Sequence, residues 1–469
     1  MISEFRQHVI ENLAKPNVRA NFRKAMDGLM QRRLDQFPDP AELERIRTQA
    51  QAIRANALSK LPELLEQLEA KLTDNGIHVH WAETTEQANQ IVLSIMQKHN
   101  AKTMIKGKSM VSEEMGLNHF LEAHGIDALE SDLGEFILQL AHEPPSHIVA
   151  PAIHKSRQDV AKLFNDKFPD IPYTENIDEL TQAARTILRD KFYSAEVGLS
   201  GVNFAVAETG TLCLVENEGN GRMSTTVPRV HIAVTGIEKV VEKLSDIPPL
   251  LSILTRSATG QPITTYFNMI SSPRKPGEKD GPEEVHLVLL DNGRSNIYSD
   301  PELLATLRCI RCGACMNHCP VYTRIGGHSY GTVYPGPIGI ILEPQKAGLD
   351  VHGELTQAST LCGACGEVCP VRIPIPTLIN RLRYEGVRKD ASTTPGTGSR
   401  RTTAEAAAWK SWSWSASHPA IYNFGTKAAA RLRGVLPMQM SAWTNVRSAP
   451  QLADKTLHER MKEMGVADE

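Results

Sequence analysis

The sequence predicts an α/β protein with a largely parallel sheet, followed by a cysteine-rich module and a short C-terminal region. Three observations lead to this prediction. Strand-like and helix-like segments alternate between residues 77 and 164, seven of the eight cysteines fall within residues 309–369, and the stretch 390–403 has the composition of a linker. Alternation at this spacing is typical of right-handed crossovers between parallel strands. A chain of 469 residues has room for roughly three domains.

The N-terminal part is expected to be helical. Residues 41–72 predict one amphipathic helix, because leucine and isoleucine recur at spacings of three, four and seven among charged residues. We expect this helix to pack as a lid or docking arm, and most of it lies in an N-terminal helical arm predicted over residues 1–69. Beyond Asn75-Gly76, strands are predicted at 77–81, 103–106, 126–130 and 147–151, with a helix over 112–125 that begins at Ser112.

Between residues 203 and 290 the predicted strands lie closer together, at 203–207, 211–216, 230–234 and 284–290, and suggest a mixed sheet. The two Gly-rich turns within 207–222 offer backbone N–H groups that could bind an anion, although plain hairpin turns explain them equally well. The segment KGKS at 106–109 resembles the end of a phosphate-binding loop. Lys102 stands where that loop requires its first glycine, so we reject this interpretation.

Composition limits the cellular setting and the partners. A formal net charge of −3 gives no general reason to expect nucleic acid, and no run of about 18 apolar residues predicts a transmembrane helix. The first residues lack the pattern of a signal peptide, so we expect a cytoplasmic protein. Clustering of the cysteines argues against a disulfide-stapled secreted protein, and the isolated Cys213 is expected to be a buried apolar side chain.

The cysteine module contains two related runs. The first has the spacing C-x2-C-x2-C-x3-C-P of bacterial ferredoxins, which bind a [4Fe–4S] cluster, and the second lacks its first cysteine. A zinc site would more often use separate C-x2-C pairs. In two-cluster ferredoxins the last cysteine of each run ligates the other cluster. This rule assigns one cluster to Cys309, Cys312, Cys315 and Cys369, and the second to Cys319, Cys362 and Cys365.

The second cluster therefore lacks one protein thiolate. Ser359 stands where the missing cysteine would be. Three outcomes stay open: the Ser359 hydroxyl as ligand, another side chain or solvent on a [4Fe–4S] cluster, or no ligand and a [3Fe–4S] cluster. His318 and His352 are possible ligands by residue type, but a solvated or backbone-bonded histidine is the simpler interpretation of both.

The C-terminal region has an unusual composition. Residues 391–450 contain seven Lys or Arg and one acidic residue, and four of the five tryptophans lie there, at Trp409, Trp412, Trp414 and Trp443. Basic residues interleaved with tryptophan suit a membrane surface, an acidic partner or nucleic acid. A small helical domain with aromatic packing is the simpler alternative.

Several long segments resemble one protein family. They are KSMVSEEMGLN (108–118), SDLGEFILQLAHEPPSHIVAPAIHK (131–155), AETGTLCLVENEGNGR (207–222), RCIRCGACMNHCPVY (308–322), GGHSYGTVYPGPIG (326–339) and LCGACGEVCPVRIPI (361–375). Over nearly the whole chain the sequence resembles the lactate utilization protein B family. The resemblance implies a lactate-utilization (LUD) domain at 70–292, similar to ribose-5-phosphate isomerase and CoA-transferase folds. It further implies an α-helical two-cluster ferredoxin module at 300–385 and a linker with a family-specific region at 386–469.

The resemblance also implies a function. Members of this family are iron–sulfur electron-transfer subunits of a three-component bacterial system that oxidises L-lactate to pyruvate and allows growth on lactate. It implies two [4Fe–4S] clusters, a cysteine-rich A subunit and a LUD-domain C subunit as partners, and the role of a non-flavin component of an L-lactate dehydrogenase complex. No catalytic residue is predicted, since no Ser/His/Asp set, HExxH or G-x-G-x-x-G after a strand is visible.

Two alternatives from other classes remain. In the first, the chain is a small-molecule binding or regulatory protein whose clusters report redox state. In the second, it is the iron–sulfur subunit of a glycolate-type oxidase, which would not need an α/β domain of this size.

Overall fold

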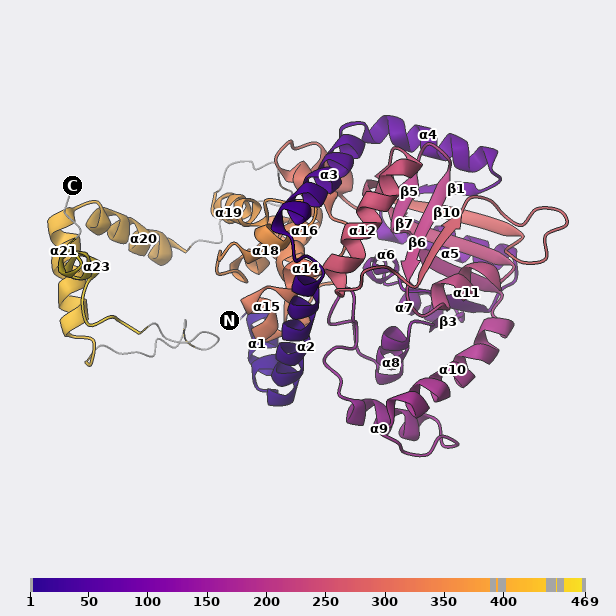
Figure 1. Ribbon diagram of the computed structural model, residues 1–469, viewed down its shortest axis with the longest axis horizontal. Helices are drawn as coiled ribbons and strands as arrows, with labels where there is room; N and C mark the ends of the chain where they lie inside the picture. Colours follow the sequence, from indigo (N-terminus) through magenta and orange to yellow (C-terminus); the bar gives the residue numbers. More distant parts are fainter. Residues whose placement is uncertain (1–2, 389–393, 395–401, 436–443, 445–450, 466–469) are drawn as a thin grey trace.

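The computed structural model describes residues 3–388, 394, 402–435, 444 and 451–465. Figure 1 shows an α/β domain, a cysteine module beside it, and long N-terminal helices that run across both. The C-terminal helices lie to the far side of the cysteine module.

The α/β domain is centred on a six-stranded, fully parallel sheet with the order β1-β10-β7-β4-β2-β3. Its two central strands consist almost wholly of buried residues, as expected for parallel strands that are covered on both faces. The strands are β1 (His78–Ala82), β10 (Glu284–Leu290), β7 (Val230–Gly236), β4 (Val197–Gly201), β2 (Thr103–Lys106) and β3 (Asp127–Glu130).

Helices cover this sheet in two groups. One face packs against α5 (Thr85–Lys98) and α7 (Leu117–Ala123) in a common hydrophobic cluster. Near the β2–β3 edge, a second cluster joins α8 (Leu133–Ala141), α9 (Arg157–Lys167) and α10 (Ile177–Ser194). The remaining helices of the domain are α6 (Met110–Glu114), α11 (Asn220–Thr226), α12 (Ile247–Ala258) and the 3-10 turns Ile237–Lys239 and Leu244–Asp246.

The predicted helix over 112–125 is wrong in detail. The structure has two helices, α6 and α7, separated by Gly116 in a left-handed conformation with φ of 60°. The cap is Ser109 rather than Ser112, because the Ser109 side chain accepts a hydrogen bond from the Ser112 backbone N–H. Positive φ interrupts a helix, and glycine tolerates it without strain.

The predicted mixed sheet over 203–290 is also corrected. The segments at 230–236 and 284–290 belong to the parallel sheet, and a separate four-stranded sheet has the order β8-β5-β6-β9. Its strands are β8 (Val240–Val241), β5 (Phe204–Val206), β6 (Thr211–Glu216) and β9 (Tyr266–Ile270). The prediction paired these strands because they lie close together in the sequence. Strands β7 and β10 instead occupy the middle of the larger sheet, which agrees with the burial of nearly all their residues.

The segment 147–151, predicted as a strand, forms a tight loop. The His147 ring accepts hydrogen bonds from the backbone N–H groups of Val149 and Ala150, both at 3.0 Å. The Ser146 backbone N–H donates to the Pro151 carbonyl at 3.0 Å. These local bonds use the polar groups that a strand would offer to a neighbour, and proline has no N–H to add.

Four helices precede the sheet: α1 (Glu4–Leu13), α2 (Pro16–Asp35), α3 (Pro40–Ser59) and α4 (Leu61–Asp74). The single helix predicted over 41–72 is thus two helices. The break falls at Lys60, just before Leu61-Pro62, because proline removes a backbone donor and restricts the preceding residue. Helices α3 and α4 contact β8, while α2 and α3 contact the cysteine module, so these helices bridge the two units.

The cysteine module is built from short helices and turns. Its core is continuous with that of the N-terminal helices and of the second sheet. The helices are α13 (Arg294–Tyr298), α14 (Ala314–Asn317), α15 (Pro320–Ile325), α16 (Gly336–Ala347), α17 (Leu349–His352), α18 (Ala364–Val368) and α19 (Ile375–Glu385), with 3-10 turns at Leu303–Arg308, Gly327–Tyr330 and Gly353–Gln357.

The C-terminal region contains α20 (Thr403–Ala416), α21 (Pro419–Arg431) and α23 (Leu457–Glu463). Trp409, Trp412 and Trp414 on α20 are exposed, and the rings of Trp409 and Trp412 meet edge to face with centroids 5.7 Å apart. Trp443 lies outside the described residues. Within the described ranges, no helix is long and apolar enough to cross a membrane.

Candidate functional site

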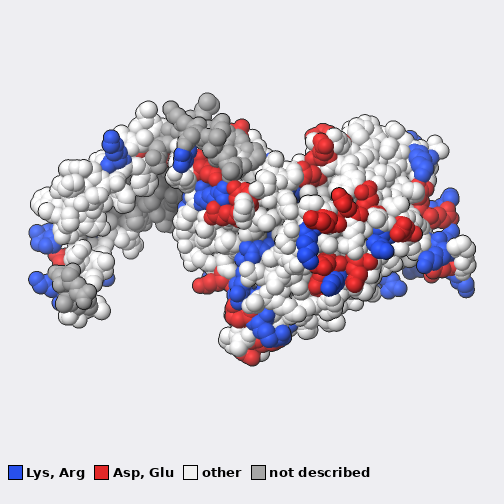
Figure 2. Space-filling model, turned by 90° about the horizontal axis from the view of Figure 1, so that it is seen from above, with Lys and Arg blue, Asp and Glu red and all other residues white. Residues whose placement is uncertain are grey.

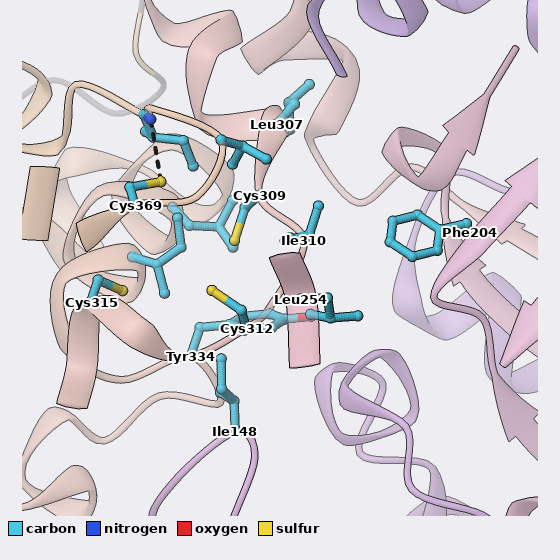
Figure 3. Packing of buried hydrophobic residues seen from close by; sticks show 14 of the residues in the cluster. Ile148, Phe204, Leu254, Leu307, Cys309, Ile310, Cys312, Cys315, Tyr334 and Cys369 are labelled. Atoms are coloured by element: carbon cyan, nitrogen blue, oxygen red, sulfur yellow. Dashed lines mark hydrogen bonds between the residues drawn. The ribbon is translucent and has the colours of Figure 1, made fainter. Parts of the chain in front are cut away.

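Four cysteines surround one small cavity. Cys309, Cys312 and Cys315 come from the first run, and Cys369 comes from the end of the second. Figure 3 shows their four sulfur atoms around a common space. The rest of the wall is largely apolar: Ile148, Ile310, Ile338, Val371, Ile373 and Ile375.

Left-handed backbone at two positions shapes the first run. Arg311 has φ of 60° and Gly313 has φ of 76°, and α14 begins directly after Gly313. The turn directs the Arg311 backbone N–H toward the Cys309 Sγ at 3.4 Å. On the opposite wall the Ile373 N–H donates to the Cys369 Sγ at 3.3 Å, the dashed line in Figure 3. Such N–H groups stabilise sulfur when it carries negative charge.

The other three cysteines form a second group. Burial raises the pKa of Cys365 to about 12, and the neighbouring Cys319 and Cys362 thiols add to this increase. These contributions to the Cys365 pKa indicate that Cys319 and Cys362 both lie near Cys365. Cys319 and Cys365 are buried, whereas Cys362 is exposed, so this group lies at the protein surface.

Ser359 occupies the place that corresponds to Cys309. The Leu361 N–H donates to the Ser359 Oγ at 3.1 Å, just as Arg311 does to the Cys309 Sγ. Leu361 has φ of 56° and Gly363 has φ of 88°, which repeat the two left-handed positions of the first run. The backbone of the second run therefore follows the same path, with a hydroxyl in place of a thiol.

Neither candidate histidine is shown as a ligand. The His318 Nδ1 hydrogen-bonds to the Ala314 carbonyl at 2.9 Å, which is the backbone-bonded arrangement named above as the simpler one. His352 lines a separate large cavity.

The donor set fits a metal–sulfur cluster. All eight cysteines are free thiols in the described structure. Burial raises the pKa of Cys312 to about 12 and that of Cys369 to about 11, so these thiols ionise at neutral pH only if a cation is bound among them. Thiolate-only sites select zinc or iron–sulfur clusters, and the repeated turn with successive three-residue steps is that of ferredoxins.

Arginines from the N-terminal helices hold the backbone of these loops. Arg47 on α3 donates to the Cys369 carbonyl at 3.1 Å and to the Gly366 carbonyl at 3.2 Å. Arg54, also on α3, donates to the Leu307 carbonyl at 3.1 Å. The sequence pattern did not reveal this role, although basic residues on the inner face of an amphipathic helix are a usable signal.

A buried ion-pair network joins the module to the α/β domain. Arg294 pairs with Glu238 at 2.7 Å and with Glu114 at 2.8 Å, and Arg311 reaches Glu238 at 3.2 Å. Burial alone would raise the pKa of Glu238, but Arg294 and Arg311 lower it to about 2. The carboxylate is therefore ionised and paired throughout the neutral range.

A cavity of about 2070 Å³ lies where the α/β domain, the N-terminal helices and the cysteine module meet. Its wall includes Glu130, the last residue of β3, and Glu113 and Glu135 from the helices that follow β2 and β3. Ligands of parallel α/β sheets bind outside the carboxyl ends of the strands, and this cavity has that position.

An unusual acidic group borders this cavity. The buried Lys106 Nζ lies 2.8 Å from the Glu113 Oε1 and 2.5 Å from the Glu130 Oε1. Glu135 is 3% exposed, and no described residue hydrogen-bonds to either of its carboxyl oxygens. Burial, and then the neighbouring Glu130, raises the pKa of Glu135 well above its usual range, which favours the protonated form of this carboxyl. Such a carboxyl can donate a hydrogen bond to a ligand.

The turns considered for anion binding have a different role. The backbone N–H groups of Gly221 and Arg222 donate to the carboxylate of Glu216 at 3.0 and 2.9 Å. In the earlier turn, the Gly210 N–H donates to the Val206 carbonyl at 3.0 Å. Three of the N–H groups considered are therefore satisfied by the chain itself.

The fold and the cysteine sites together define a LUD-domain protein with an iron–sulfur module. Residues 65–290 match the family described as LUD domain, and residues 305–373 match the 4Fe-4S dicluster domain. Residues 381–466 match the family described as lactate utilisation protein B, C-terminal.

Similar proteins extend over the whole chain. It is 42% identical over 459 residues to lactate utilization protein B of Bacillus licheniformis, which covers 95% of this chain and 94% of the relative. It is 41% identical over 478 residues to lactate utilization protein B of Bacillus subtilis, covering 98% of both. An Escherichia coli protein named uncharacterized electron transport protein YkgF is 41% identical over 462 residues, covering 96% and 94%. The chain belongs to the lactate utilization protein B family.

Proposed function

We propose that this chain is the iron–sulfur electron-transfer subunit of a multi-component system that oxidises L-lactate to pyruvate in the cytoplasm. The observation that carries the proposal is the gathering of Cys309, Cys312, Cys315 and Cys369 from both runs around one cavity, in a member of this family. An iron–sulfur cluster bound there supplies one-electron transfer, which links a two-electron oxidation to a separate acceptor.

We assign Cys309, Cys312, Cys315 and Cys369 to one [4Fe–4S] cluster. We assign Cys319, Cys362 and Cys365 to a second, which has only three protein thiolates and is either [4Fe–4S] with an exchangeable corner or [3Fe–4S]. The grouping is supported by the effects of Cys309 and Cys369 in raising the pKa of Cys312, and of Cys362 in raising that of Cys319, although Cys365 also contributes to the raised pKa of Cys315. Ser359, at the position that corresponds to Cys309, is an oxygen candidate for the remaining corner.

The two cysteine sites differ in the charge and the exposure of the residues around them. Arg33 and Arg47 lie within electrostatic range of Cys369 or Cys312, and their charge offsets that of the thiolates in the enclosed first site. The exposed Cys362 places the second site where a partner protein could approach. We therefore propose that electrons enter or leave through the second site.

The proposed partners are the cysteine-rich A subunit and the LUD-domain C subunit of such a system. We propose that α20 and α21 contribute to docking, because Trp412, Trp414 and Phe424 expose large aromatic surfaces there. Aromatic side chains of this kind are enriched where proteins associate. On the part of the molecule away from the C-terminal helices, Figure 2 shows Lys, Arg, Asp and Glu side chains intermixed on the visible face.

The test combines the three purified subunits under anaerobic conditions and adds L-lactate. We expect pyruvate to form and the visible absorbance of this chain to bleach at a rate that matches turnover. D-lactate and a mixture that contains the Cys312→Ala variant serve as controls. Absence of bleaching by L-lactate in the complete mixture would reject the proposal.

A second candidate function is the binding of a small organic acid by a redox-reporting regulatory protein. The cavity at the carboxyl ends of β2 and β3, with the unpaired carboxyl of Glu135, favours it. Equilibrium dialysis of the isolated, cluster-loaded chain with labelled L-lactate separates the two. Tight binding without turnover in the complete mixture supports regulation, whereas turnover supports electron transfer.

A further inference from the structure

A second group of side chains of metal-ligating types lies outside the cysteine module, at the parallel sheet of the α/β domain. His99 follows α5 as its cap, and Glu284 and His286 are the first and third residues of β10. Glu284 begins its strand, so the group lies at the amino ends of the parallel strands, opposite the large cavity at their carboxyl ends.

The three side chains converge. The His99 Nε2 lies 3.2 Å from one carboxylate oxygen of Glu284, and the His286 Nε2 lies 3.0 Å from the other. One ligand atom from each residue falls within 4.8 Å of the others. Ligands 2.0–2.1 Å from a tetrahedral metal lie about 3.4 Å apart, so this spacing suits a single ion.

Both imidazole nitrogens that face Glu284 lack a conventional hydrogen bond. The Nε2 atoms of His99 and His286 are buried, and neither makes a hydrogen bond with any described residue. His286 is 3% exposed, which makes an unsatisfied nitrogen costly unless something binds it.

The other nitrogen of His286 is already oriented. Its Nδ1 lies 2.9 Å from the His80 Nε2, and the two rings stack with centroids 5.2 Å apart. A proton on the His286 Nδ1, donated to His80, leaves the Nε2 lone pair directed at the Glu284 side. Metal-bound histidines are commonly held in this way through their second nitrogen.

We propose that His99, Glu284 and His286 bind one divalent transition-metal ion of the Zn²⁺ type through two imidazole nitrogens and one carboxylate. Two histidines and one glutamate form a known zinc ligand set, with a fourth position for water. The His78 Nε2, 3.8 Å from Glu284, is the protein group available for that position. Such an ion ties the end of α5 to the β1–β10 edge of the sheet.

Lys98 provides a specific test of the proposed metal site. Its ammonium contacts the same carboxylate oxygen of Glu284 that faces His286. In the metal-free protein this charge offsets Glu284, and it must move or be repelled when a cation binds. Removal of Lys98 is therefore expected to tighten metal binding, which a purely structural imidazole stack would not do.

The test uses the full-length, cluster-loaded chain, with iron and sulfide measured before and after Zn²⁺ titration under anaerobic conditions. We expect one equivalent of Zn²⁺ to bind without loss of iron. His99→Ala and the isosteric Glu284→Gln should each weaken binding about tenfold or more, and Lys98→Met should strengthen it severalfold. His119→Ala, which removes an exposed histidine paired with Glu122 on α7, is the matched control and should change nothing.

Three results would overturn the proposal: no Zn²⁺ bound beyond that which displaces iron, equal binding by the wild type and by both ligand variants, or an unchanged affinity in Lys98→Met together with unchanged affinity in Glu284→Gln. Circular dichroism of each variant checks the fold, and Glu284→Gln, which preserves shape, serves if His99→Ala is unstable.

Discussion

The first cysteine run and the second differ mainly in their surroundings. Both turn through left-handed residues at the same two positions, Arg311 and Gly313 in one and Leu361 and Gly363 in the other. The first is enclosed by the α/β domain and the N-terminal helices, and all of its thiols are buried. The second contains the exposed Cys362 and carries Ser359 in place of a thiol. The two runs share a backbone path but differ in how far the protein encloses them. We infer that the first site would hold its cluster more firmly, and that the second would be more accessible to solvent and partner proteins.

The largest expected effect comes from Cys369→Ser, which tests whether the two runs exchange ligands. Although Cys369 belongs to the second run, it faces the cavity of the first. We expect loss of roughly half of the iron and sulfide, with the enclosed cluster lost first. Measurement is by metal analysis and EPR of the reduced protein.

Cys213→Ser is the control, since Cys213 is equally buried but lies in β6, away from both runs. Loss of only the surface-exposed cluster in Cys369→Ser would show that each run binds its own cluster.

Next in size is Glu238→Gln, which tests how strongly the first run depends on the α/β domain. The change removes a buried charge shared by Arg294 and Arg311, and breaking such a pair costs about 3–5 kcal/mol. Denaturant unfolding of the cluster-loaded protein measures it. Glu283→Gln, in exposed pairs with Arg229 and Arg274, should have little effect. Equal stability of Glu238→Gln and wild type would contradict the tight coupling inferred here.

The same carboxylate predicts a pH dependence. The folded pKa of Glu238 is lowered to about 2, below the ordinary value near 4.3. A lowered pKa gives stability that is present above the unfolded value and is lost as pH falls from about 4.3 toward 2. The difference in unfolding free energy between wild type and Glu238→Gln should therefore shrink across this window. A difference that stays constant with pH would show that Glu238 is not ionised in the folded protein.

A smaller effect is expected from Ser359→Cys, which makes the two runs alike. The backbone already presents the Ser359 Oγ as it presents the Cys309 Sγ, so a thiol there needs no rearrangement. A thiol also ionises far more readily than a hydroxyl, at a pKa near 8.5. We expect the variant to resist conversion to [3Fe–4S] on brief exposure to air, as followed by EPR. In the wild type, that signal should appear.

Ser359→Ala is the informative companion. If it behaves like the wild type, the hydroxyl is not a ligand; if it alone gives the [3Fe–4S] signal, serine holds the fourth corner and our expectation is wrong.

The smallest effect on the clusters is expected when the chain ends near Thr394, before α20. No cluster cysteine lies beyond Cys369, so iron content should be unchanged, while association with the partner subunits should weaken. Pull-down and liposome flotation measure the association. Changing Trp409, Trp412 and Trp414 to alanine should reproduce the loss, and Tyr193→Ala, at another exposed aromatic residue, should not. Unchanged association would leave a small helical domain as the explanation of the region.

The sequence was most informative where chemistry depends on close spacing. The three-residue steps between cysteines and the position of Ser359 could be read directly, because a tight turn brings such residues together. The α/β class also followed from local periodicity, and it agrees with the LUD and dicluster families. Pairing of β7 with β4 could not be read, since β4 was not recognised and its partners lie far along the chain.

Long-range contacts were invisible for the same reason. Glu135 is unusual only because folding buries it beside Glu130 and Lys106. Arg47 meets the Cys369 carbonyl across 322 residues of sequence. The strand predicted at 147–151 failed because the His147 side chain satisfies its own backbone, a choice that hydrophobic pattern does not reveal.

The hydrogen bonds from α3 to the cysteine loops affect the order in which the protein can fold and receive its clusters. Arg47 and Arg54 are synthesised about 250 or more residues before the groups they hold, and α3 must rest on the second sheet to present them. Contacts of such high sequence separation form late, because the intervening chain has to be ordered first. We therefore expect the clusters to be inserted after most of the chain has folded, and we expect an excised segment 300–385 to lack the hydrogen bonds from Arg47 and Arg54. The ferredoxin-like sequence motif is contained within residues 309–370, but because its core is shared with the N-terminal helices we do not expect this part to fold on its own.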